Sequence, residues 1–135
     1  MKDLNDFIGI EFLNRGRSFT HCDCYGLVML YFREILGITI PDVIASPKQP
    51  KMSHLEYLDN ISKHWEELNY PDENFVVALS THPSHPNLVT HFGVVVKVDG
   101  RLKMLHTFKD TKSHLVDLDN PAYKPRIKAY YKWLN

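Results

Sequence analysis

One nearly uninterrupted apolar stretch constrains the fold of this 135-residue chain more than any other feature. It runs from Cys24 to Leu36, reads CYGLVMLYFREIL, and is apolar on nearly every side of a helix. Asp23 before it is a favoured N-cap residue, and Gly37 after it is a favoured helix terminator. The stretch therefore predicts a buried central helix with Cys24 in its first turn, against which the rest of the chain must pack.

A second helix is predicted ahead of Pro71, a residue that prevents helix continuation. Ser53 with Glu56 three residues later forms a capping box, and apolar residues then recur at helical spacing. The apolar face of this predicted helix consists of Leu55, Leu58, Ile61, Trp65 and Leu68. We expect it to lie on the surface with that face turned inward.

The remaining regular segments have the β-branched and aromatic composition of strands. They cover residues 75–80, 91–98, 101–108 and 126–133. Asp99-Gly100, between the second and third segments, is a strong signal for a two-residue hairpin turn. Helices followed by antiparallel strands predict an α+β fold. Because no repeat, low-complexity tract or Gly/Ser linker divides the chain, we expect a single domain over residues 1–135.

Charge and hydropathy limit the classes of partner that the chain can bind. Lys plus Arg number 16, as do Asp plus Glu, so no net field attracts nucleic acid or anionic lipid. No apolar run reaches the ~20 residues that span a bilayer, and the N-terminus lacks a signal-peptide pattern. We expect synthesis in the cytoplasm without a signal peptide, no nucleic-acid partner and no membrane insertion. Cys22 and Cys24 are too close in sequence for an unstrained disulfide, so two free thiols are expected.

Cys24 is the candidate nucleophile. At a helix N-terminus, unpaired backbone N–H groups and the helix dipole favour the thiolate, so the sequence predicts a lowered thiol pKa there. The same N–H groups could donate to the oxyanion that forms when a thiolate adds to a carbonyl. The alternative is simple packing, since cysteine is among the most often buried residues.

The predicted hairpin brings two histidines together. If Asp99 and Gly100 form the loop, Gly93 faces His106, which makes His91 a diagonal neighbour of His106 on the same face. Two imidazoles in reach of each other offer a general base and a partner that orients it. The alternative is that two of the eight histidines share a face by chance.

Five segments, in matching order and at matching intervals over nearly the whole chain, resemble the NlpC-type cell-wall cysteine peptidases. They are Gly9–Ser18, Asp23–Val28, Gly37–Asp42, Thr90–Val96 and Leu105–Thr107. The resemblance implies a papain-like fold with a catalytic cysteine, histidine and third polar residue at Cys24, His91 and His106. It also implies hydrolysis of an amide in the peptidoglycan stem peptide, commonly the D-γ-glutamyl–diamino acid bond. We expect no cofactor and no metal.

Within that family the chain looks most like compact phage-tail members, which share the Asp-Cys-aromatic-Gly-Leu-Val helix start and the Gly-Ile-x-x-Pro-Asp turn. This likeness implies tail proteins as partners and delivery by a virion tail to the bacterial cell wall. One departure concerns Glu11-Phe12, where the family often has Pro-Tyr. A tyrosine hydroxyl that assists the oxyanion is therefore absent at this position.

The sequence leaves two other functions open. The first is a catalytically silent tail-assembly module with the same fold. The second is a zinc-binding domain, because thiolates and imidazoles are ligands that zinc prefers. Its ligands would come from His21, Cys22, Cys24, His91 and His106. The Cys-x-Cys spacing speaks against zinc, since zinc knuckles have two residues between their cysteines.

Overall fold

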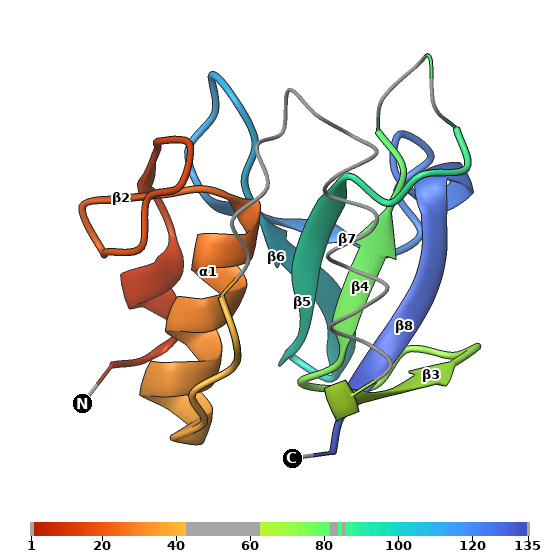
Figure 1. Cartoon of the computed structure of the whole chain (residues 1–135), viewed down its shortest axis with the longest axis horizontal. Helices are drawn as coiled ribbons and strands as arrows, with labels where there is room; N and C mark the ends of the chain where they lie inside the picture. The colour runs from red at the N-terminus through yellow and green to blue at the C-terminus, as the bar shows by residue number, and fades with distance from the viewer. Residues whose placement is uncertain (1, 43–62, 82–83, 85, 135) are drawn as a thin grey trace.

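The computed structural model describes residues 2–42, 63–81, 84 and 86–134. A helical segment lies beside a curved antiparallel sheet and packs mainly on strand β5 (Figure 1). The segment begins as α1 (Cys24–Tyr31) and continues as η2, a wider π-helical turn (Phe32–Leu36). Gly37 ends it with a left-handed φ of 69°. The predicted helix from Cys24 to Leu36 is confirmed.

Over the described residues, the main sheet has six strands in the order β3-β8-β4-β5-β6-β7, with every neighbouring pair antiparallel. Its strands are β3 (Trp65–Leu68), β4 (Val76–Leu79), β5 (His91–Val98), β6 (Arg101–His106), β7 (His114–Asp117) and β8 (Ile127–Trp133). The four predicted strands correspond to β4, β5, β6 and β8, with ends that differ by at most two residues. The α+β prediction is therefore confirmed.

Smaller elements precede the helix and β8. The strands β1 (Glu11–Phe12) and β2 (His21–Cys22) pair in parallel. Single turns of 3₁₀ helix form η1 (Leu4–Phe7) and η3 (Lys124–Arg126). None of these elements was predicted from the sequence, because two to four residues are too few to show a hydrophobic period.

The prediction of the second helix is wrong at the carboxyl end of that helix. Residues 63–64 are helical, but Trp65–Leu68 form the edge strand β3, which pairs with β8. The Trp65 ring packs edge-on against Trp133, with centroids 4.9 Å apart, and against Phe32, at 5.6 Å. Pairing and aromatic packing with distant segments thus outweigh the local helical spacing. The part predicted for residues 53–62 lies outside the described residues.

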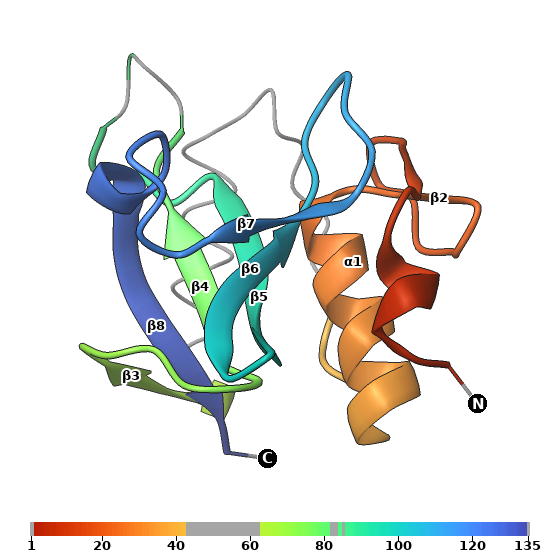
Figure 2. The same ribbon diagram turned by 180° about the vertical axis from the view of Figure 1, so that it is seen from behind.

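The sheet separates two hydrophobic clusters. One fills the space between the helix and the sheet and includes Leu27, Val28, Val94 and Leu105. The other covers the opposite face and consists of Phe75, Val77, Leu79, Val95 and Met104. Partly buried residues of β3, β7 and β8 pack on this second cluster. The sheet accordingly curls, and Figure 2 shows both edge strands, β3 and β7, crossing the others.

The N-terminal segment is bound to the chain just before β7. Ser113 Oγ donates to the Phe7 carbonyl at 2.6 Å and accepts from the Ile10 N–H at 2.8 Å. The Gly9 N–H also donates to the Ser113 carbonyl, at 2.8 Å. Phe7 itself is fully buried. These contacts join the N-terminal segment to the loop between β6 and β7.

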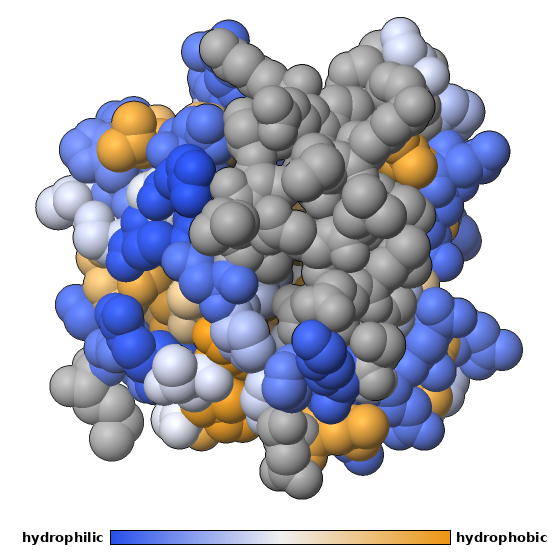
Figure 3. Space-filling model, in the orientation of Figure 1, coloured by the Kyte–Doolittle hydropathy of each residue, from blue (hydrophilic) through white to orange (hydrophobic). Residues whose placement is uncertain are grey.

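The surface in Figure 3 is mixed, with hydrophilic residues along both sides of this face and hydrophobic residues gathered toward its lower middle. Among the described helices, none is both long enough and apolar enough to cross a bilayer. The fold thus places its apolar side chains mainly in the two clusters on either side of the sheet.

Candidate active site

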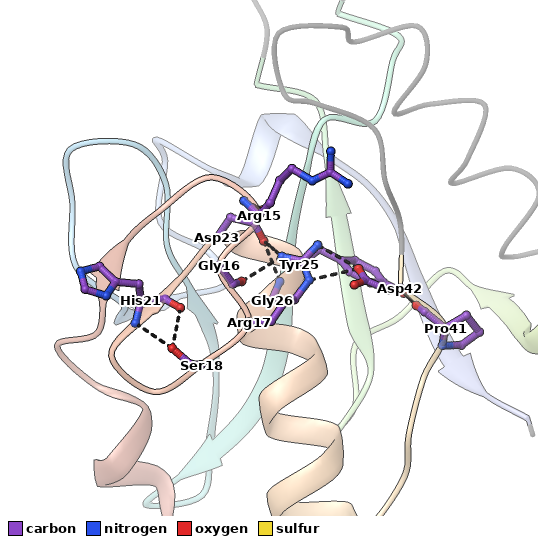
Figure 4. A network of polar contacts seen from close by, with 10 residues as sticks. All are labelled: Arg15, Gly16, Arg17, Ser18, His21, Asp23, Tyr25, Gly26, Pro41 and Asp42. Carbon is purple, nitrogen blue, oxygen red and sulfur yellow. Dashed lines mark hydrogen bonds and ion pairs between the residues drawn. The ribbon is translucent and has the colours of Figure 1, made fainter.

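Asp23 holds the helix start at which Cys24 lies (Figure 4). Its carboxylate accepts hydrogen bonds from the N–H of Gly26 at 2.8 Å and from the N–H of Arg15 at 2.8 Å. It also accepts from the Arg17 guanidinium at 2.7 Å. The predicted N-cap is confirmed, and the same carboxylate orders the loop before the helix.

Arg17 connects the chain before the helix to the chain after it. Its guanidinium contacts Asp23 at 2.7 Å and Asp42 at 2.9 Å. Close by, the Tyr25 hydroxyl donates to the Pro41 carbonyl at 2.6 Å. Figure 4 shows these residues converging on the first turn of α1. The position of the helix start is therefore fixed by charged and polar contacts from both sides.

Gly26 is required by a close backbone approach. A Cβ at this position would collide with the carbonyl oxygen of Gly16 and would lie 3.2 Å from Asp23 Oδ1. Backbone cannot move aside as the end of a side chain can. Glycine at the third position of the helix therefore lets the preceding loop pack directly on the turn that bears Cys24.

The thiol of Cys24 lies at the beginning of β5. Backbone hydrogen bonds from Phe92 and Tyr25 reach it, and although the residue is partly exposed, the thiol itself is enclosed. Burial raises the pKa of the Cys24 thiol to about 12, and the Asp23 carboxylate acts in the same direction. The prediction of a lowered thiol pKa is therefore wrong for this state. Burial and a neighbouring negative charge outweigh the helix N-terminus.

His91 and His106 share a hydrogen bond. His91 Nε2 lies 2.8 Å from His106 Nδ1. The register of β5 with β6 is the predicted one at all five paired positions. Asp99 and Gly100 both have left-handed φ values, 51° and 78°, as a type I′ turn requires. The prediction that the hairpin brings the two imidazoles together is confirmed.

Both histidines are buried, with His91 3% exposed and His106 0% exposed. Burial lowers the pKa of His91 to about 4, and the charge that His114 can carry adds to the effect. Burial likewise lowers the pKa of His106 to about 3, with His91 and His114 as further causes. Both rings are therefore neutral at neutral pH.

The structure places the Cys24 thiol against the main chain of the residue that follows His91. Within the described part of the chain, the thiol is bound at the main chain of Phe92, the residue after His91, and makes no hydrogen bond to the His91 ring. Because Nε2 of His91 is engaged by His106, Nδ1 is the ring nitrogen left for a proton from the thiol.

Three aromatic residues that the sequence analysis did not single out surround His106. The ring centroids of Phe108, His114 and Tyr123 lie 5.5, 4.6 and 4.8 Å from that of His106. His114 stands directly opposite His106 in the β6–β7 pair. A signal existed in the sequence, a second histidine eight positions after His106, but the four half-polar residues of β7 were too few to predict a strand.

Cys22 differs from Cys24 in its surroundings. It is fully buried within the cluster between helix and sheet, and burial raises the pKa of its thiol to about 12. His21 beside it is exposed. Across the described residues, no group of three or more His, Cys, Asp or Glu side chains gathers as metal ligands. The ligands of the zinc hypothesis are thus not brought together.

Comparison with known proteins rests on structure alone, since no family model and no curated protein sequence matches this chain. NlpC1 from Trichomonas vaginalis is similar with a TM-score of 0.69 and 16% identity, over 97% of this chain and 42% of that protein. A Staphylococcus aureus protein described as similar to an NLP/P60-family lipoprotein gives a TM-score of 0.62 and 15% identity, over 96% of this chain and 38% of its own.

This chain thus spans about two fifths of the length of each of these structures. Likeness at such low identity bears on the arrangement of the elements, and here it extends over nearly the whole chain. The predicted papain-like α+β arrangement, with the cysteine at a helix start beside an antiparallel sheet, is confirmed. The chain has the NlpC/P60-type fold.

Proposed function

We propose that this chain is a cysteine peptidase that hydrolyses an amide bond in the peptidoglycan stem peptide. Cys24 is the nucleophile, His91 the general base and His106 the residue that orients the base. The observation that carries the proposal is the 2.8 Å hydrogen bond between His91 and His106, at the end of the sheet where the capped helix presents Cys24. The NlpC/P60-type fold supports it.

The raised thiol pKa and the lowered imidazole pKa values imply a neutral pair at rest. The thiol leaves its backbone hydrogen bonds at Phe92 and gives its proton to His91 Nδ1 as the sulfur attacks the substrate carbonyl. The imidazolium that forms donates from Nε2 to His106 Nδ1. His91 then returns the proton to the departing amine, and water hydrolyses the thioester with His91 again as base.

The oxyanion receives a backbone donor from the helix start. Asp23 already engages two N–H groups there, that of Gly26 through its carboxylate and that of Leu27 through its carbonyl. Among the described contacts none uses the Cys24 N–H, which is placed next to the reacting sulfur. Phe12 has no hydroxyl to contribute. We expect a slower acylation step than a hydroxyl-bearing residue at this position would give.

The D-γ-glutamyl–diamino acid amide is the bond we propose as substrate, and a phage tail is the proposed carrier to the cell wall. Both follow from the motif resemblance of the helix start and the Gly37–Asp42 turn. Tail proteins are the corresponding partners. The spacing of these motifs over nearly the whole chain supports the assignment.

One observation favours a second candidate, a catalytically silent tail-assembly module. The Cys24 thiol is enclosed and bound to main-chain N–H groups rather than to the His91 ring. A protein that uses the fold only for contacts would keep the thiol in this state. Reactivity of Cys24 toward a small thiol reagent separates the two candidates, because only the peptidase must expose its sulfur.

The test is digestion of muropeptides and of walls with different diamino acids, followed by mass spectrometry. We expect one new amide-cleavage product, which Cys24→Ala abolishes while circular dichroism stays unchanged. Cys22→Ala is the matched control and keeps most of the activity, since Cys22 lies in the hydrophobic cluster. A folded protein that releases no product from any wall type would favour the assembly module.

A further inference from the structure

We infer that His114 is a positioning residue that holds the proton of His106 on Nε2 and so leaves His106 Nδ1 free to accept from His91. The inference rests on the proposed function, in which His91 must have an unprotonated Nδ1 facing the thiol. It concerns a residue on a strand that the sequence analysis did not predict. Its basis is the order of proton donors and acceptors along three neighbouring imidazoles.

The outer end of this series is fixed by the main chain. His114 Nδ1 lies 2.7 Å from the Lys112 carbonyl oxygen. A carbonyl can only accept, so Nδ1 of His114 carries a proton and donates it. In the neutral ring, Nε2 of His114 therefore has a free lone pair. The backbone thus determines the tautomer of His114 without help from another side chain.

The ring of His114 packs against the ring of His106. The two residues face each other across β6 and β7, with ring centroids 4.6 Å apart and planes inclined by 58°. His106 Nε2 is buried and has no hydrogen-bond partner among the described residues. A buried polar atom without a partner costs free energy, so its surroundings influence whether that atom carries the proton.

Two surroundings favour a proton on His106 Nε2. The first is the ring of His114, whose centroid lies 4.6 Å from that of His106. Its unprotonated Nε2 carries a lone pair, which attracts a donor and repels another lone pair. The second is the ring of Tyr123, which stands nearly perpendicular to His106 at 84° with centroids 4.8 Å apart. An aromatic face is a weak acceptor for N–H groups, and no comparable interaction exists for a nitrogen lone pair.

At the contact between His106 and His91, the position of the His106 proton decides whether His91 can act as a base. If His106 carried its proton on Nδ1, it would donate to His91 Nε2 across the 2.8 Å contact. His91 would then have its own proton on Nδ1 and could not accept one from Cys24. With the proton on Nε2, His106 accepts from His91 instead. The proton order from Lys112 inward is therefore the one that makes His91 a base.

The experiment uses the whole chain with ¹⁵N-labelled histidine at neutral pH. Nitrogen chemical shifts distinguish a protonated ring nitrogen from an unprotonated one, so they report the tautomer of His106 without any substrate. We expect Nε2–H in the wild type. His114→Phe keeps a ring in place but removes the lone pair, so we expect a mixture of tautomers and about a tenfold loss of kcat with KM nearly unchanged.

Rescue and control variants complete the test. His114→Gln restores an oxygen acceptor near the position of Nε2, so we expect Nε2–H on His106 and most of kcat to return. His21→Phe, the same change at an exposed histidine, serves as the control and is expected to alter neither readout.

Two results would overturn the inference. One is Nδ1–H on His106 in the wild type, and the other is an unchanged His106 tautomer in His114→Phe. Failure of the proposed function gives a different pattern. A wild type with Nε2–H on His106 that cleaves no peptidoglycan refutes the peptidase and leaves the tautomer assignment of His106 standing.

Discussion

The two sides of the candidate site are held together by different interactions, charged and main-chain contacts on one side and packed rings on the other. The cysteine side comprises Arg15, Arg17, Asp23, Cys24 and Gly26 and is held by ion pairs and main-chain hydrogen bonds at a helix start. The histidine side comprises His91, His106, Phe108, His114 and Tyr123. In it, the buried His91 and His106 share a hydrogen bond, and the rings of the other three residues lie around His106.

The two sides differ in what sets the state of the thiol and of the imidazoles. On the cysteine side, position is determined by contacts to rigid backbone, while the Asp23 charge opposes ionisation of the thiol. On the histidine side, burial keeps His91 and His106 neutral, and packing determines which ring nitrogens face each other. Substitutions should therefore alter thiol ionisation on the first side and proton location on the second.

The largest expected effect is a loss of kcat that differs between substitutions of His91 and of His106. His91→Ala removes the base, so its kcat should fall close to the level of Cys24→Ala. His106→Ala removes only the orienting contact and should retain measurable turnover, and His106→Asn should recover part of the loss because an amide can still accept from an imidazole. Rates on the cleaved muropeptide measure this. Equal inactivity of the Asn and Ala variants would mean that His106 acts by ionisation.

The next effect compares two glycines, one on each side. Gly26→Ala places a methyl group against the Gly16 carbonyl, so we expect unfolding free energy to fall by about 3 kcal/mol. At Gly93 the new Cβ meets Met104 Cγ at 2.6 Å and the Leu105 carbonyl oxygen at 3.0 Å. Because methionine can adjust and the backbone contact is less close than at Gly26, Gly93→Ala should cost less, about 1 kcal/mol. Urea denaturation measures both. A larger loss for Gly93→Ala would contradict the view that the cysteine side is the more rigid.

Stability against pH tests the neutral character of the histidine side. The pKa of His91 is about 4 in the folded protein, against 6.5 for an ordinary histidine, and that of His106 is about 3. Between these values the unfolded chain binds more protons than the folded one. Unfolding free energy should therefore decrease as the pH falls from about 6.5 toward 4 and be steady above that window.

Urea midpoints across that window provide the measurement. His106→Asn, which removes one of the two groups, should show a shallower decrease than the wild type. A midpoint that stays level from neutral pH down to about pH 5 would show that the rings are charged or accessible in the folded protein.

The smallest effect concerns thiol reactivity. Asp23→Asn keeps an oxygen that can cap the helix but removes the charge that adds to the effect of burial in raising the Cys24 pKa. Alkylation of Cys24 at neutral pH should therefore speed up severalfold. Asp42→Asn also removes an Arg17 partner but leaves Asp23 in place, and it serves as the matched control. Mass spectrometry of the Cys24 peptide gives the rates. Equal acceleration in both variants would attribute the effect to Arg17.

The sequence predicted those parts of the molecule in which local chemistry and tertiary structure agree. The Asp23 cap, the Gly37 terminator and the Asp99-Gly100 turn each depend on a few neighbouring residues. From the turn alone the contact between His91 and His106 could be worked out. The same logic explains why four of the six strands of the main sheet were predicted with nearly correct ends.

What the sequence did not predict depends on distant partners. Trp65 lies in a strand because β8 pairs with it, although its spacing favours a helix. The thiol pKa of Cys24 is raised by enclosure against β5, which no local pattern shows. His114 joins the site only through β7, whose four residues carry no strand signal of their own.

The Asp99-Gly100 turn determines which insertions and deletions in the β5–β6 hairpin are compatible with the candidate site. The turn lies at the far end of the hairpin from the His91–His106 contact, yet it sets the register that creates this contact. Inserting one residue into β6 between Arg101 and His106 would turn the imidazole to the opposite face of the sheet, whereas inserting two would return it to the same face one step further along. Tolerated insertions and deletions in β6 between Arg101 and His106 should therefore contain an even number of residues. This constraint comes from a two-residue turn that lies far from the histidine pair.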